Sequence, residues 1–257
     1  MIAPPTYNKY CLLLFVLLSQ TALAQQIEIS PRPANSESPT LSPQIWARIG
    51  AGVTQARYSQ SVPQFTDIAM SDDLGPSLHF DAGRWWSWHW GANAYFKNTP
   101  GVFKSSLATE VQQGNFSFRR AGIEMLYRTH PVFEEQRKET FLKLGIHQHE
   151  LPFLIPVTNV TLRQQSNRVN TVGVGAEHHR NLSQHFRLEG FLRYQYPFTS
   201  GVTPHFTMDG AFGLVHHLPH NWLVALFWTG EWHDYKYETG SQNLFQSTFD
   251  LRAGVEF

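Results

Sequence analysis

The stretch Phe249-Asp-Leu-Arg-Ala-Gly-Val-Glu-Phe257 decides the fold class of this sequence. Its odd-numbered positions carry Phe, Leu, Ala, Val and Phe, whereas its even-numbered positions carry Asp, Arg, Gly and Glu. Successive side chains of a β-strand point to opposite faces, so the pattern sets an apolar face against one medium and a polar face against another. The stretch therefore predicts a β-strand between two unlike media.

The same period of two recurs upstream and predicts about ten strands, with eight or twelve left open. Most of these strands have about 10–15 residues, against a mean of about 5–6 in soluble sheets. A tilted strand needs about 9–11 residues to cross a bilayer, so the lengths favour an all-β transmembrane antiparallel barrel over a soluble sandwich. The predicted strands are 44–58, 74–86, 88–97, 116–128, 140–150, 168–178, 185–196, 204–216, 222–235 and 244–257.

The connections between these strands alternate between short turns and longer polar loops. That rhythm is typical of outer-membrane barrels, with short periplasmic turns and longer outer loops. Two connections that should be outer loops, 197–203 and 236–243, are short, which is why the strand number stays open. The short turns are 86–88, 129–139, 179–184 and 217–221, and the long loops are 59–73, 98–115 and 151–167.

The composition fits a chain in which one face of each strand contacts lipid. The sequence is 42% hydrophobic but only 16% charged, and its mean hydropathy is −0.31. Soluble domains carry about 25% charged residues, while helical membrane proteins need spans of ~20 apolar residues. Because the formal net charge is zero, we expect no nucleic-acid partner.

The first 24 residues have the pattern of a signal peptide. Lys9 precedes the apolar run 12–18, and Ala22-Leu-Ala24 is a small-residue cleavage site. The one cysteine, Cys11, would leave with this segment, so the mature chain would have no thiol. We therefore expect an exported protein.

Residues 25–43 differ in composition from the predicted barrel strands. Four prolines and several serines and asparagines favour a flexible periplasmic arm, because proline blocks both helix and sheet pairing. The predicted organisation is a signal peptide (1–24), this arm (25–43) and a barrel (44–257).

Residues 249–257 resemble the last strand of Gram-negative outer-membrane β-barrels. Those proteins typically end in a phenylalanine, here Phe257, that closes an alternating apolar face and is read by the barrel-assembly machinery. The resemblance implies a location in the outer membrane. It also implies that the barrel meets outer-membrane lipid and lipopolysaccharide, and that the assembly machinery is its partner during biogenesis.

The polar faces of the predicted strands carry both signs of charge, which favours salt bridges across a narrow lumen. Eight strands already leave little room beyond side chains, and water-filled pores take about 16. We expect an envelope structural role, an adhesion role or the passage of a small solute. The residues are Arg48, Glu124, Lys143, Glu177, Arg187, Glu189, Arg193, Asp209, Glu231, Asp250, Arg252 and Glu256.

One alternative is an outer-membrane enzyme acting on lipid or peptide, as hydrolase or acyltransferase. Ser77, His79 and Asp81 fall on one face of a strand at steps of about 6.6 Å, where an Asp could orient a His beside a Ser nucleophile. Alternating polar residues also arise by chance on any lumen-facing strand. A third possibility is a soluble periplasmic sandwich that binds a ligand.

Ten of the 13 histidines form two groups. His147, His149, His205 and His233 share the predicted lumen face, where imidazoles could bind a transition metal with Glu231. Structural histidines of a polar lumen would look the same. No cofactor is expected, because the sequence has no phosphate-binding loop and no Cys–His zinc spacing. Gly173 and Gly175 lie inside a predicted strand, where glycine favours curvature or ring packing over phosphate binding. The second group, suited to protonation near pH 6, is His178, His179, His185, His216, His217 and His220.

Overall fold

The computed structural model describes most of the sequence from residue 45 onward. The predicted signal peptide (1–24) and arm (25–43) lie outside the described residues. The described ranges are 45–62, 68–101, 104–105, 110–112, 116–129, 138–158, 161–183, 185–237 and 240–257.

Ten long strands form, as predicted, and their alternating residues account for them. Two short strands, β4 (Lys104–Ser105) and β5 (Glu110–Gln112), pair with the long ones. The long strands are β1 (Ile45–Ser61), β2 (Ile68–Trp85), β3 (Trp90–Gly101), β6 (Phe116–Arg128), β7 (Lys138–Pro156), β8 (Thr161–Asn181), β9 (Phe186–Pro197), β10 (Val202–His217), β11 (Trp222–Tyr237) and β12 (Gly240–Glu256).

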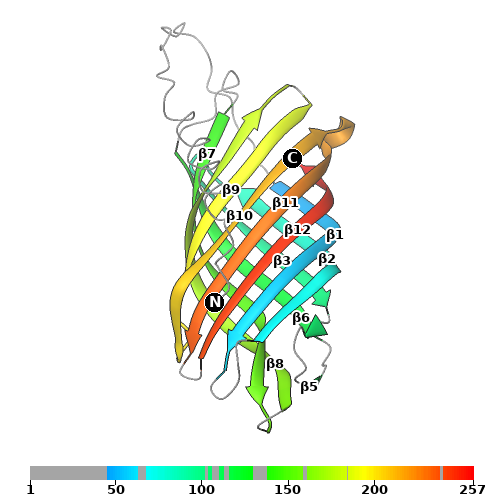
Figure 1. Ribbon diagram of the computed structural model, residues 1–257. Helices are drawn as coiled ribbons and strands as arrows, with labels where there is room; N and C mark the ends of the chain where they lie inside the picture. Colours follow the sequence, from blue (N-terminus) through cyan, green and yellow to red (C-terminus); the bar gives the residue numbers. More distant parts are fainter. Residues whose placement is uncertain are drawn as a thin grey trace, which may run out of the picture. The chain divides into compact units, whose positions relative to one another are not determined.

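The long strands close into one antiparallel barrel (Figure 1). Each pairs with the next in chain order, and β1 pairs with both β2 and β12, with Trp46 opposite Gly83 and Glu256. This single closed sheet confirms the all-β barrel and excludes the two packed sheets of a sandwich. Among the described residues, no helix is long and apolar enough to cross a membrane.

The two ends of the barrel differ in their connections and are named by them. At the turn end, β1 begins, β12 ends, and short turns join β2 to β3, β8 to β9, and β10 to β11. β6 also ends and β7 begins at the turn end. At the loop end, β1 ends and β2 begins, and the tips of the β7–β8, β9–β10 and β11–β12 hairpins lie there. In Figure 1 the turn end is at the top.

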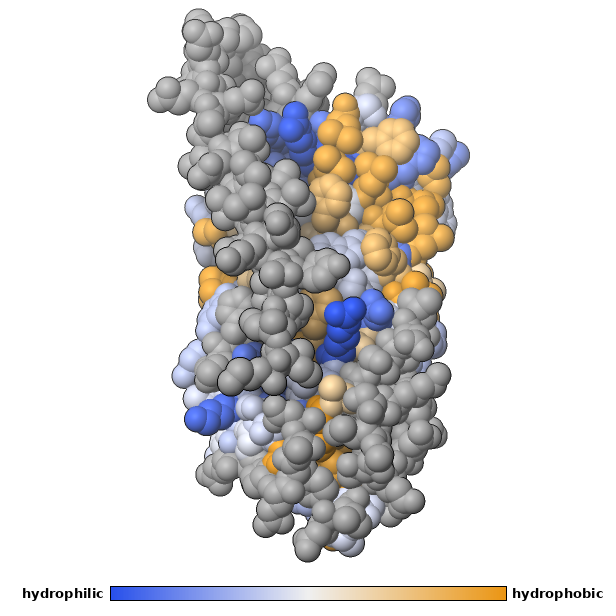
Figure 2. Space-filling model, viewed as in Figure 1, coloured by the Kyte–Doolittle hydropathy of each residue, from blue (hydrophilic) through white to orange (hydrophobic). Residues whose placement is uncertain are grey.

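The outer wall is apolar over the turn-end part of the strands. One row across β6 to β9 joins Ile123, Ile146, Val172 and Tyr196, all of them exposed. Figure 2 shows apolar residues gathered toward the turn end on the coloured part of the wall. A barrel in water would not keep such a wall, whereas a bilayer requires it.

The height of this apolar band can be read along β1. Its outward positions are apolar from Ile45 to Val53 and become polar at Gln55. Eight steps of about 3.3 Å, tilted by about 45°, give a height of about 19 Å. The value approaches the ≈ 25 Å band of outer-membrane barrels. The rest of the strand continues past the band.

The prediction of a loop at residues 151–167 was wrong. β7 continues to Pro156 and β8 begins at Thr161, so most of this segment is a paired hairpin. Pro152 argues against a central strand, because proline cannot donate a sheet hydrogen bond. However, β6 pairs with β7 only up to Glu150, so one edge of β7 has no paired neighbour in the described residues beyond that point. A proline on this unpaired edge loses no sheet hydrogen bond, so the strand tolerates it.

Candidate functional site

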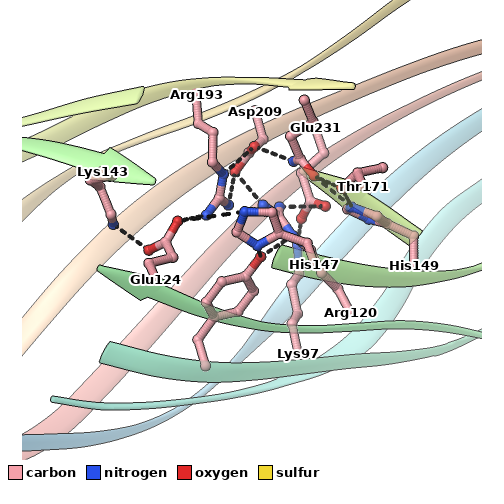
Figure 3. Close-up of polar contacts among 12 residues, drawn as sticks. Lys97, Arg120, Glu124, Lys143, His147, His149, Thr171, Arg193, Asp209 and Glu231 are labelled. Atoms are coloured by element: carbon pink, nitrogen blue, oxygen red, sulfur yellow. Dashed lines mark hydrogen bonds and ion pairs between the residues drawn. The ribbon is translucent and has the colours of Figure 1, made fainter. Parts of the chain in front are cut away.

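Buried ion pairs fill the middle of the lumen (Figure 3). Asp209 on β10 lies between two arginines: it accepts hydrogen bonds from Arg120 Nη2 at 2.6 Å and from Arg193 Nε and Nη2 at 3.0 and 2.6 Å. Gln195 Nε2 donates a fourth bond at 2.6 Å. Arg120 comes from β6, on the opposite side of the lumen from β10, so this ion pair spans the lumen.

Glu231 on β11, directly opposite Asp209 in the β10–β11 pairing, forms a second set of ion pairs across the lumen. It accepts from Lys97 Nζ of β3 at 2.5 Å and from Arg120 Nη1 at 3.1 Å. Lys97 also donates to Thr248 Oγ1 at 2.8 Å. Neither β3 nor β6 neighbours β11 in the sheet, so these side chains bridge strands that face each other.

The network extends toward the turn end. Glu124 on β6 pairs with Arg193 on β9 and with Lys143 Nζ at 2.8 Å. Arg48 on β1 forms a two-pronged pair with Glu189 on β9, at 2.7 and 3.0 Å. These contacts confirm the prediction that mixed charges in the lumen form mutual salt bridges.

An apolar cluster closes the lumen at the loop end. Two glutamines secure it: Gln60 Nε2 donates to the Leu154 carbonyl at 2.9 Å, and Gln60 Oε1 accepts from the Leu154 amide at 2.8 Å. Gln242 Nε2 donates to the Pro152 carbonyl at 2.7 Å. The unpaired edge of β7 is thereby bound to β1 and β12. The cluster is Ala56, Tyr58, Val62, Ile68, Phe118, Leu151, Leu154, Leu162, Val169, Tyr235 and Leu244.

A cavity of about 150 Å³ lies between the ion pairs and the turn end. Its lining includes Trp46 and Glu256 at the ends of β1 and β12, and it reaches inward to Glu231. Aromatic residues form part of its wall, and Arg128 lies over the Trp85 ring at 4.2 Å. The lumen therefore holds a polar recess that stops at the ion pairs.

The predicted catalytic residues all lie on the lumen side of β2, but only two of them line this cavity. His79 Nε2 is 3.2 Å from Asp81 Oδ1, and both residues are in the cavity wall. Asp81 Oδ1 also lies 3.6 Å from Arg252 Nη1. Ser77 is 2% exposed, and the described part of the cavity lining does not include it.

Three of the four predicted metal-binding histidines, His147, His149 and His233, are buried inside the barrel. His149 Nε2 is 2.7 Å from Gln195 Oε1, and its ring centroid is 4.9 Å from that of His233. His147 Nδ1 is hydrogen-bonded to the Tyr95 hydroxyl at 2.8 Å. His205 lies in β10, and its side chain is outside the described part of the chain. A metal site made of these residues stays a prediction.

The His147 ring explains two glycines in the strands around it. A Cβ at Gly173 would lie 2.6 Å from His147 Nε2, and one at Gly122 would overlap His147 Nδ1. Both glycines leave space for the imidazole. Of the two roles expected for the glycines of this strand, ring packing fits Gly173, whereas a Cβ at Gly175 would meet the backbone of Leu192 and Arg193 instead.

A different group of possible metal ligands was missed. Among the described residues, Glu177, His179 and Glu189 are the set of three whose donor atoms all lie within 4.8 Å of one another. The sequence places Glu177 and His179 two positions apart on one strand. Glu189 joins them through the pairing of β8 with β9, which places it opposite His179.

Comparisons with known proteins identify the class through structure alone. No family model and no curated protein sequence matches the chain. The outer membrane protease OmpT from Escherichia coli is similar in structure, with a TM-score of 0.58 at 10% identity, covering 85% of this chain and 99% of OmpT. The fold is that of a Gram-negative outer-membrane β-barrel.

Two further solved structures align over most of this chain. An outer membrane channel from Pseudomonas putida F1 has a TM-score of 0.44 at 10% identity, covering 89% of this chain and 100% of that one. Ail, the attachment invasion locus protein of Yersinia pestis, has a TM-score of 0.37 at 14% identity, covering 82% and 98%.

Proposed function

We propose that this protein is a closed surface scaffold of the outer membrane, serving adhesion or envelope structure. One observation carries the proposal: the strands continue as a paired sheet beyond the apolar band, around a lumen that is filled. Past the row of Ile146 and Val172, the outward residues are polar, with Gln148 and Glu150 on β7 and Arg168 on β8.

The filled lumen supports a scaffold more than the passage of a solute. A solute entering from the turn end would meet the Arg120–Asp209 and Lys97–Glu231 pairs and then the apolar cluster around Leu154. Ten strands lie close to the size at which side chains fill a barrel, far below the roughly 16 of an aqueous pore.

The orientation of the barrel follows from its connections. Short turns face the periplasm in outer-membrane barrels, and longer loops face outward. With the turn end in the periplasm, the loop end projects from the cell, and the cavity is reached from the periplasm. The β7–β8 hairpin, built from strands of 19 and 21 residues, would then be presented at the surface.

The partners proposed for this scaffold are those of its membrane. The apolar band would contact lipid chains. Above it, Arg119 and Arg168 stand on either side of Glu150 across three neighbouring strands, where they would meet phosphates of lipopolysaccharide. Phe257, whose backbone pairs with Ile45 at 2.8 and 2.9 Å, would be read by the assembly machinery.

Cysteine labelling of intact cells tests the proposed orientation. Cys11 is the one native cysteine and would leave with the predicted signal peptide, so introduced thiols can be followed singly. We expect a membrane-impermeant maleimide to label Ser59→Cys, which faces outward beyond the band, on intact cells. Leu182→Cys, in the β8–β9 turn, should be labelled only after permeabilisation, and Ile146→Cys should be protected by lipid in both conditions. Labelling of Leu182→Cys on intact cells would contradict the orientation.

The same strains report on adhesion. A bulky maleimide on Ser59→Cys should reduce attachment of the cells to a surface, with identically treated Leu182→Cys cells as the matched control. Equal attachment of the two strains would exclude the adhesion role and favour the envelope structural role.

A second candidate function is the envelope hydrolase or acyltransferase. The contact of His79 with Asp81 in the cavity wall favours it, because a carboxylate orients a catalytic imidazole in this way. Ser77 lies outside the described cavity lining, and Asp81 is also engaged by Arg252, so the scaffold is favoured.

A further inference from the structure

Three side chains converge on the wall of the turn-end cavity, where β8 pairs with β9. His179 Nε2 is 2.6 Å from Glu177 Oε1 and 3.9 Å from Glu189 Oε2. All three line the cavity, and their side chains are mostly buried. One imidazole nitrogen and two carboxylate oxygens thus face the same small volume.

Two of the three distances between these donor atoms lie within about 0.7 Å of the spacing around a tetrahedral ion, and all three are below 4.8 Å. Ligands about 2.0–2.1 Å from Zn²⁺ stand about 3.3 Å apart at tetrahedral angles. The distance from His179 to Glu177 would open by about 0.7 Å and that to Glu189 would close by about 0.6 Å.

The surrounding residues hold each ligand in place. Lys143 Nζ contacts Glu177 Oε2 at 2.8 Å, which leaves Oε1 directed at His179. Arg48 donates to both oxygens of Glu189, and Arg187 Nε also donates to Oε1 at 2.8 Å. The Phe141 ring lies edge-on to the His179 ring, with centroids 4.8 Å apart. Such outer contacts orient metal ligands in proteins.

We propose that Glu177, His179 and Glu189 form a zinc site with one position open to the cavity. Two carboxylates and one imidazole are a donor set that Zn²⁺ accepts, with water as the fourth ligand. Lys143, Arg48 and Arg187 already neutralise the carboxylate charge, so the affinity is lower than that of a site with unpaired carboxylates. The bound ion would join β8 to β9 at the turn end.

Zinc titration of the full-length protein in detergent, after removal of metals with a chelator, tests the site. Calorimetry should show one Zn²⁺ per chain for the native protein. His179→Ala should abolish this binding, and Glu177→Gln should weaken it at least tenfold. His178→Ala is the matched control, because His178 points to the other face of β8 and should leave the binding unchanged.

Other histidines at the turn end must be separated from this site. The His185 and His216 rings lie 6.4 Å apart, so a His216→Ala variant is titrated in parallel. Cobalt in place of zinc should give the visible absorption of a tetrahedral ion, lost in His179→Ala but kept in His216→Ala. Heat-modifiable migration on a gel shows that each variant is folded. Zinc binding that survives in folded His179→Ala, or that disappears in His216→Ala, would overturn the proposal.

Discussion

Replacing Asp209 by alanine is expected to lower the free energy of unfolding by about 3–5 kcal/mol, the cost of breaking a buried ion pair by removing one partner. Asp209 is fully buried and accepts four hydrogen bonds, three of them from Arg120 and Arg193. Without the carboxylate, two buried guanidinium groups lose a shared partner. The barrel scaffold depends on this centre more than on any outward-facing charge.

The measurement is urea unfolding of the protein in lipid vesicles, followed by tryptophan fluorescence. Asp209→Asn keeps the shape and removes the charge, so it should fall between the native protein and the alanine variant. Glu150→Gln is the control on the outer wall, where the pair with Arg119 is at 3.6 Å and partly exposed. It should change stability by less than about 1 kcal/mol. Equal effects of Asp209→Ala and Glu150→Gln would refute a central role for the lumen network.

Replacing Gln60 and Gln242 together by leucine should detach the β7–β8 hairpin from the loop end. The two side chains supply partners for three backbone groups, the amide and carbonyl of Leu154 and the carbonyl of Pro152. A buried polar group left unpaired costs about 1–3 kcal/mol, so we expect a loss of at least about 2 kcal/mol in unfolding free energy. Amide exchange at Leu154 should also become faster.

The control for this variant is Gln55→Leu, which makes the same change on the outward face of β1. Amide exchange measured by mass spectrometry should be faster over the hairpin in the double variant and unchanged in the control. Hairpin amides that stay as protected as in the native protein would show that the apolar cluster alone closes the loop end.

The barrel itself was predictable because a strand between lipid and a filled lumen must alternate at every step. Residues 249–257 show that alternation without interruption, and β12 forms there as predicted. The extension of β7 beyond Glu150 was missed because this part of the strand does not pair with β6. On such an edge, Pro152 and Pro156 no longer indicate a loop.

The contacts across the lumen were less accessible from the sequence. The closeness of His79 to Asp81 follows from their spacing on one strand. Arg48 and Glu189 are 141 positions apart, and their pairing depends on which strands face each other. That depends on the strand number and stagger of the closed sheet, neither of which one strand pattern determines.

The central claim, that the lumen is closed, is tested most directly by ion conductance across a planar lipid bilayer. Purified native protein is reconstituted under conditions in which gel migration shows folded barrel, and a general porin in the same bilayer serves as the positive control. We predict no discrete conductance steps from the native protein. Stable, repeated channel openings would contradict the claim and favour the passage of small solutes.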